Sequence, residues 1–165
     1  MTELRAFLQR QPLDYPDTAA LGQCLRALVE VGLDQLPLPG SGRTLERFQS
    51  LAAVAGHDLG VCKLYEGHTD ALAIIEQLGG CTQPGSTWGM WAAEPPNARL
   101  RVSRQGHRVS LHGRKAWCSG AAATSCTESR KGWARGSSVM GPPVIAWAGC
   151  PVYSCGRRRE TEEAP

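Results

Sequence analysis

The residues of this chain whose types could do chemistry gather in one stretch, Leu111 to Ala121. A strand-like segment leads to a large aromatic residue, Trp117, which is followed by the thiol of Cys118, the hydroxyl of Ser119 and then Gly120. Taken alone, Trp117 is interpreted as a core tryptophan at the end of a sheet, and Ser119 as a turn residue. The chain has no Ser-His-Asp ordering, no Gly-x-Gly-x-x-Gly segment and no Walker-type loop. Nucleophilic hydrolysis and phosphate-loop binding therefore have no motif to support them.

Four helices are predicted upstream of this stretch, because apolar residues recur there at three- and four-residue steps. The first is expected from Thr2 to Arg10, and the second begins at a cap, Asp17 or Thr18, and stops at Gly32. The third starts at Thr44 and the fourth spans Leu59 to Leu78. Asp58 can cap the fourth helix, and Gly79-Gly80 can end it.

The faces of the last two helices can be predicted from the same periodicity. The third helix places its apolar residues on one face: Leu45, Phe48, Leu51, Ala52 and Ala55. The fourth helix is apolar over several faces, which is typical of an interior helix. His57 and His68 are eleven positions apart, too isolated for a metal pair, and are interpreted as loop or surface histidines.

After residue 85 the periodicity changes from helical to strand-like. Thr87 to Ala93 is aromatic and small, and two alternating segments, Leu100 to Arg104 and His107 to His112, flank a turn at Gln105-Gly106. We therefore expect an α+β fold, with an N-terminal helical bundle over 1–85 and a partial antiparallel β domain over 86–123. Residues 124–165 show no folding pattern and are expected to form an irregular tail.

The composition limits which binding partners and which cellular compartment can be expected for this protein. A chain of 165 residues with a net charge of +3 can bury one sizeable core but lacks the clustered basic face of a nucleic-acid binder. It has no signal-peptide pattern and no apolar run long enough for a membrane span, so we expect a cytoplasmic protein. The isolated cysteines are interpreted as small buried side chains: Cys24, Cys62, Cys81 and Cys118. The tail cysteines lack the spacing of a zinc site: Cys126, Cys150 and Cys155.

Two segments support a family resemblance. The run Gly113-Arg-Lys-Ala-Trp-Cys-Ser-Gly-Ala121 resembles the Gly-x-Lys-x-Trp segment of the acyl-CoA dehydrogenases, and Met90-Trp-Ala-Ala-Glu-Pro95 resembles their Tyr-Cys-Val-Thr-Glu-Pro segment. The order of the helices before them also agrees with the all-α N-terminal domain of that family. The resemblance covers residues 1–123. It implies a flavoprotein of fatty acid metabolism that oxidises the CH–CH bond of an acyl-CoA.

The resemblance implies an FAD site rather than a catalytic centre. The ring of Trp117 is expected to pack on the flavin, and the hydroxyl of Ser119 to hydrogen-bond near flavin N5. The full expected set of cofactor contacts is Met90, Ala92, Ala93, Trp117, Cys118 and Ser119. An acyl-CoA substrate and a homo-oligomer are implied in the same way.

Two departures from the family matter. Pro96-Asn97-Ala98-Arg99 stands where the family has a Gly-x-Gly-Ser-Asp segment. The carboxylate base of the family lies in a C-terminal helical domain for which 165 residues leave no room, so we expect an inactive, truncated fragment. The tail carboxylates are interpreted as solvated charges: Glu128, Glu160, Glu162 and Glu163. Our hypothesis for the tail is translation out of frame from a GC-rich gene.

Two other functions remain open at this point. The first is a non-enzymatic α+β interaction module with a disordered basic tail. The second is a zinc-binding module that uses the tail cysteines.

Overall fold

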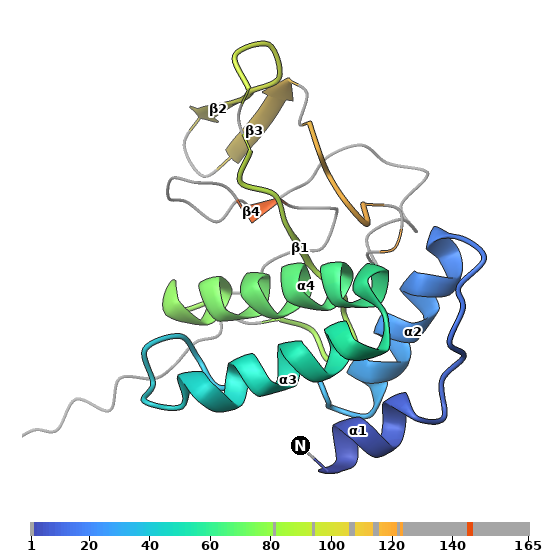
Figure 1. The fold of residues 1–165 in the computed structure, drawn as a ribbon. Coiled ribbons are helices and arrows are strands. Elements are labelled where there is room, and N and C mark those ends of the chain that lie inside the picture. The colour runs from blue at the N-terminus through green and yellow to red at the C-terminus, as the bar shows by residue number, and fades with distance from the viewer. Residues whose placement is uncertain are drawn as a thin grey trace, which may run out of the picture.

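The structure, a computed structural model, describes residues 2–80, 82–93, 95–105, 108–113, 116–121, 123 and 145–146. Helices dominate the described residues and short strands follow them (Figure 1). The helices are α1 (Thr2–Leu8), α2 (Thr18–Glu30), α3 (Thr44–His57) and α4 (Leu59–Gln77). The strands are β1 (Gly89–Met90), β2 (Leu100–Gln105), β3 (Arg108–Gly113) and β4 (Ile145–Ala146). The predicted helical N-terminal part is therefore confirmed.

Local signals set the ends of the helices. The side chains of Asp17 and Asp58 each accept a hydrogen bond from the backbone N–H three residues further on, at 2.8 and 2.7 Å. Such an oxygen satisfies a backbone donor that the first helical turn leaves unpaired. Gly32 and Gly79 follow α2 and α4 with φ of 72° and 74°, a left-handed conformation that glycine adopts without a steric cost. The predicted caps and stops are confirmed.

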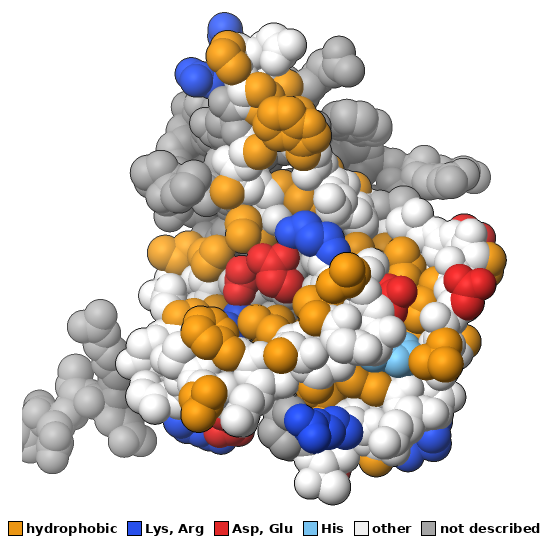
Figure 2. Space-filling view, in the orientation of Figure 1, with side chains coloured by type: hydrophobic (Ala, Val, Ile, Leu, Met, Phe, Trp, Pro, Cys, Tyr) orange, Lys and Arg blue, Asp and Glu red, His pale blue; other side chains and the backbone are white. Residues whose placement is uncertain are grey.

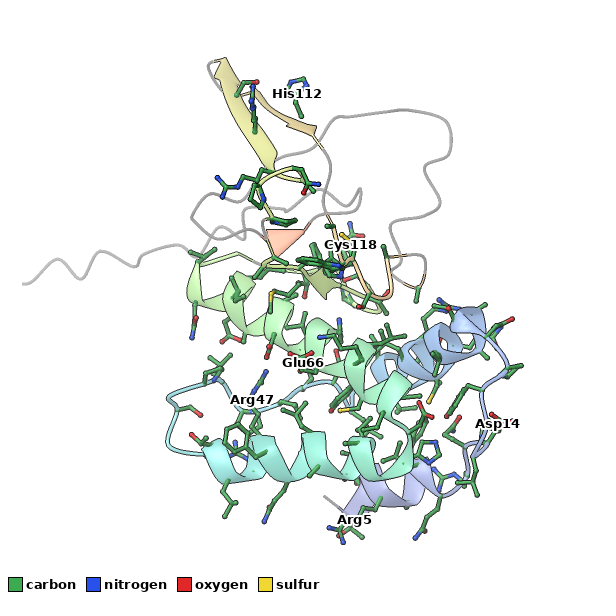
Figure 3. The ribbon with its side chains drawn as sticks, turned by 45° about the horizontal axis from the view of Figure 1, so that its top comes forward. Arg5, Asp14, Arg47, Glu66, His112 and Cys118 are labelled. Atoms are coloured by element: carbon green, nitrogen blue, oxygen red, sulfur yellow. The ribbon has the colours of Figure 1, made fainter. Side chains whose placement is uncertain are left out.

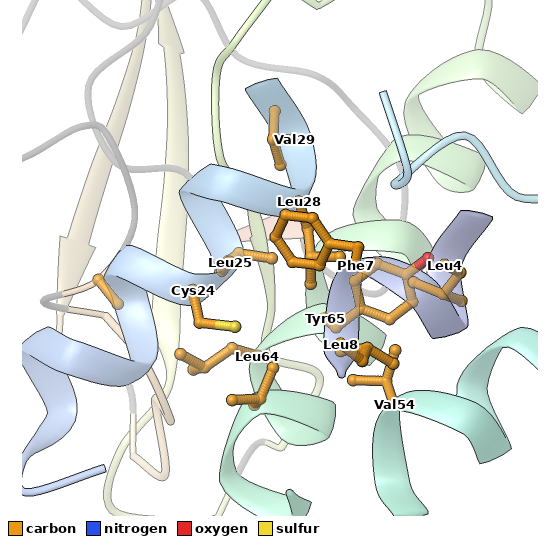
Figure 4. Packing of buried hydrophobic residues seen from close by; sticks show 12 residues of the cluster. Leu4, Phe7, Leu8, Cys24, Leu25, Leu28, Val29, Val54, Leu64 and Tyr65 are labelled. Atoms are coloured by element: carbon orange, nitrogen blue, oxygen red, sulfur yellow. The ribbon is translucent and has the colours of Figure 1, made fainter. Parts of the chain in front are cut away.

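Helix α4 lies at the centre of the helical part, in contact with α2, α3 and β1 (Figure 1). Nine of its nineteen residues are buried, which confirms the interior position predicted from its broad apolar pattern. It shares one hydrophobic cluster with the other three helices (Figure 4). Tyr65 is fully buried in that cluster, and its hydroxyl donates a hydrogen bond to the Leu33 carbonyl after α2. None of the described helices combines the length and apolarity that crossing a membrane requires.

The face predicted for α3 is wrong at Leu45 and Phe48, although Leu51 of the same set is half-buried against the core. Leu45 and Phe48 are 70% and 60% exposed, and the buried residues of the helix are Arg47, Ser50 and Val54. Hydrophobic side chains are visible on the solvent-facing surface over α3 in Figure 2. Periodicity alone misplaces the face because Arg47 is buried by specific polar partners, which a pattern of apolar residues does not register.

The described strands form two separate two-stranded pairs. β2 pairs with β3 in an antiparallel register from Leu100 opposite Gly113 to Gln105 opposite Arg108. β1 pairs with β4, with Gly89 opposite Ala146. These pairs share no sheet, so the described residues do not amount to the partial β domain of the expected α+β class. Within the tail, only residues 145–146 belong to the described part of the chain.

Candidate functional site

Two segments that are distant in sequence lie together above α4. The indole Nε1 of Trp91 donates a hydrogen bond to the carbonyl of Ser119 at 2.8 Å, across 28 residues of sequence. These are the segments on which the family resemblance rests, one following β1 and the other forming the turn at 116–121. Figure 3 shows Cys118 of this turn close to β1, the strand that packs on α4. The fold therefore brings the first segment into contact with the second at Trp91 and Ser119.

A small cavity lies where the two segments meet the helices. Its volume is about 20 Å³, and its lining includes Lys63, Gly67, Met90, Trp91 and Ser119. A cavity of this size has room for about one water molecule. An aromatic ligand at this place would therefore have to lie on the surface of the two segments.

The candidate contact residues differ in exposure. Trp117 is 73% exposed, so it is not the core tryptophan that its sequence context alone suggests. Ser119 and Ala92 are exposed, and Met90 and Ala93 are half-buried. The half-buried Cys118 thiol lies 3.7 Å from the carbonyl of Ala116. The site thus presents one large aromatic ring with a hydroxyl and small side chains beside it.

The backbone of Trp117 has an unusual conformation. Its φ is 54°, the one positive value at a non-glycine residue in the described part of the chain. The left-handed region costs a residue with a side chain about 1–2 kcal/mol, and strain of this kind concentrates at functional sites. The turn holds the indole outward at an energetic cost.

Glycine at position 120 allows the turn to pack on α4. Gly120 has φ of 73°, and a Cβ atom there would collide with the side chain of Leu64. The turn also reaches α2, where a Cβ on Gly22 would lie 2.8 Å from the Cβ of Ala123. Arg26 of α2 donates to the Ala123 carbonyl at 3.4 Å. These close approaches place the turn relative to the helices.

A buried polar network beneath the site was not expected from the sequence. The His68 side chain is 0% exposed, so its assignment as a loop or surface histidine is wrong. Its Nε2 lies 3.1 Å from Oδ2 of Asp34, and its Nδ1 accepts a hydrogen bond from the Trp88 backbone N–H at 3.0 Å. A signal was present, because His68 follows Tyr65 by three positions on the buried stripe of α4.

A second buried charge ties α3 to α4. Nη2 of Arg47 lies 2.6 Å from Oδ1 of Asp70, and Nη1 donates to the Pro37 carbonyl at 3.2 Å. The Arg47 side chain is 5% exposed and that of Asp70 is 32% exposed. Figure 3 shows Arg47 between the two helices. This pair orders the helical layer, and it lies on the side of α4 that contacts α3.

The described thiols of the helical part are poor nucleophiles. Burial raises the pKa of Cys24, although a hydrogen bond from Tyr15 opposes the shift, and burial with the nearby Glu66 charge raises the pKa of Cys62. Burial and the contact with Cys24 also raise the pKa of Tyr15 well above its usual range. The Tyr15 hydroxyl lies 2.9 Å from Nε2 of His57, which is half-buried at the end of α3. A reactive thiolate needs a lowered pKa, and the pKa values of these two thiols are raised.

Several sequence-predicted residues lie outside the described part of the chain. They include Glu94 of the Glu-Pro segment and Arg114 and Lys115 before Trp117. The tail carboxylates also lie outside it: Glu128, Glu160, Glu162 and Glu163. So do four of the cysteines: Cys81, Cys126, Cys150 and Cys155.

Comparison of the chain with protein-family models, curated proteins and solved structures finds no match. The case for any function therefore depends on the residues of the site and their geometry.

Proposed function

We propose that residues 1–123 are the flavin-facing part of an acyl-CoA dehydrogenase-like flavoprotein, with FAD lying against Trp117 and the Met90–Ala93 segment. The observation that carries the proposal is the hydrogen bond between Trp91 and Ser119 at 2.8 Å. The two segments named by the resemblance are independent in sequence, and nothing in their local patterns requires them to meet. Their contact is what a shared ligand-binding role would need.

The shape of the site is compatible with one face of a flavin. An isoalloxazine is flat and apolar over its faces, and the exposed ring of Trp117 offers a surface on which it can stack. The cavity beside it is too small for a ring system. The described residues would therefore cover one side of the cofactor and leave the other side open.

Each expected contact has a distinct role in this proposal. Trp117 would stack on the ring system, the exposed Ser119 hydroxyl would hydrogen-bond to its polar edge, and the backbone at Met90, Ala92 and Ala93 would line the other edge. Cys118 would contribute contact only. Bound FAD would supply the hydride acceptor for oxidation of a CH–CH bond in an acyl-CoA substrate.

The remaining expectations belong to the same proposal. The β2–β3 hairpin would be the start of an antiparallel middle domain over residues 86–123, and the protein would assemble as a homo-oligomer. A reducing compartment such as the cytoplasm is supported by two free thiols among the described residues, Cys24 and Cys62.

Equilibrium dialysis of the full chain against FAD tests the proposal. Stacking on an aromatic ring contributes about 0.5–1.5 kcal/mol, so Trp117→Leu should weaken FAD binding about two- to tenfold. Phe48→Leu is the matched control, because Phe48 is also an exposed aromatic residue but lies on α3. The proposal fails if the wild-type chain does not bind FAD, or if both variants bind it equally well.

A second candidate function is a protein-interaction module. Leu45 and Phe48 expose apolar side chains one helical turn apart on α3, away from the Trp117 site. Such a pair on a helix surface is suited to contact with another protein. A chain that binds no FAD but whose association in solution is lost in Phe48→Asp would favour this function.

A further inference from the structure

His68 connects three segments of the chain through its two ring nitrogens. It lies on α4, it accepts a hydrogen bond from the backbone of Trp88 after that helix, and it contacts Asp34 in the turn after α2. The side chains of His68 and Asp34 are 0% and 5% exposed. Water therefore cannot substitute for either partner without opening the core.

The hydrogen bonds determine which nitrogen carries the proton. A backbone N–H can only donate, so Nδ1 of His68 must be the acceptor and carry no proton. A neutral imidazole has one N–H, which must then be on Nε2, and this group points at the Asp34 carboxylate. The assignment does not depend on the charge of Asp34, because the Trp88 N–H alone excludes a proton on Nδ1.

We propose that His68 is the positioning residue of the site: Asp34 holds it as the neutral Nε2–H tautomer, and its Nδ1 fixes the backbone of Trp88 against α4. Trp88 immediately precedes β1, and Trp91 at the end of this short segment holds the carbonyl of Ser119. The position of the 116–121 turn therefore depends on a buried imidazole to which it is not directly bonded.

The segment that contains Trp88 packs directly on α4, where Trp88 and Met90 share a hydrophobic cluster with Ala71 and Ile75. Thr87 and Trp88 are 1% and 4% exposed, so the segment enters β1 through the interior. A buried backbone N–H that loses its acceptor destabilises the fold, which makes the His68 bond a strong constraint on the segment.

Two nearly isosteric variants separate positioning from simple packing. Asparagine places its side-chain oxygen near the site of Nδ1, so His68→Asn keeps an acceptor for Trp88. Glutamine places its amide near the site of Nε2, so His68→Gln keeps the contact with Asp34 and removes the acceptor. Both variants lose the ring, and a residue that only fills the core would give no difference confined to the Trp88 amide.

Amide hydrogen exchange of the full chain, followed by NMR, provides the test. Relative to the core amides of α2, the Trp88 amide should exchange at least tenfold faster in His68→Gln than in His68→Asn. Equal relative rates in the two variants would overturn the proposal.

If the variants do not fold, a measurement on the wild-type chain tests the proposed tautomer of His68. The nitrogen-15 shifts of the His68 ring should show an unprotonated Nδ1 and a protonated Nε2 near neutral pH. A protonated Nδ1 would contradict the proposal. Neither measurement needs a flavin, so the result is separate from the FAD titration.

Discussion

Trp117 offers a sharp test of the geometry of the site, because neither its backbone conformation nor its exposed side chain is expected to stabilise the fold. Its φ of 54° favours glycine, yet 73% of its side chain is exposed, so the ring gains little from burial. We compare Trp117→Gly with Trp117→Ala. Both variants remove the ring, and they differ only in the backbone preference of the new residue.

The expected difference in the free energy of unfolding between the two variants follows from two opposing effects. Alanine at a left-handed position costs about 1–2 kcal/mol, whereas glycine costs about 0.4–1 kcal/mol through the greater freedom of the unfolded chain. The glycine variant should therefore be more stable than the alanine variant by about 0.5–1 kcal/mol. Urea unfolding followed by circular dichroism measures the difference. If the chain binds FAD as proposed, both variants should also lose the part of that affinity that depends on the ring.

Ala116→Gly is the internal control for the comparison. Ala116 is the preceding residue and has no positive φ, so glycine there should destabilise the protein by about 0.4–1 kcal/mol. Opposite effects of glycine at adjacent positions would identify the backbone of Trp117 as the cause. If Trp117→Gly is less stable than Trp117→Ala, the left-handed conformation of this residue is refuted.

Two further perturbations test the buried charges. Asp70→Ala should destabilise the protein more than Arg47→Met, because the first leaves a guanidinium buried without its carboxylate and the second removes the charge while filling its space; the reverse order in urea unfolding would contradict the assigned pairing. Burial by itself raises the pKa of Asp34, but hydrogen bonds from His68 and Gln35 outweigh it and leave the pKa below its ordinary value of 3.8. Because the folded pKa is lowered, ionised Asp34 stabilises the protein above about pH 4, and this stabilisation is lost as the pH falls further. The stability advantage of the wild-type chain over Asp34→Asn should therefore shrink as the pH falls below about 4. An advantage that does not change with pH would argue against an ionised Asp34.

The two segments of the candidate site could be predicted from the sequence. Their contact with each other and the exposure of their side chains could not. The order of Met90 to Pro95 and Gly113 to Ala121 along the chain indicated a shared role. Their contact depends on the Trp91 indole reaching the Ser119 carbonyl, and a hydrogen bond across 28 positions leaves no trace in local patterns. The exposure of Trp117 could not be predicted either, because an aromatic residue beside a strand can lie in a core or on a surface.

The sequence by itself determined the helices of this protein, since their ends depend on neighbouring residues. Asp17 and Asp58 cap helices through backbone groups three positions away, and Gly32 and Gly79 stop them through their own φ angles. Only the tertiary structure determined which polar side chains are buried in the core. His68 is buried because two segments outside its helix supply a donor and an acceptor at its ring nitrogens. The free energy of burying a polar group depends on such partners, and these come together only when the chain folds.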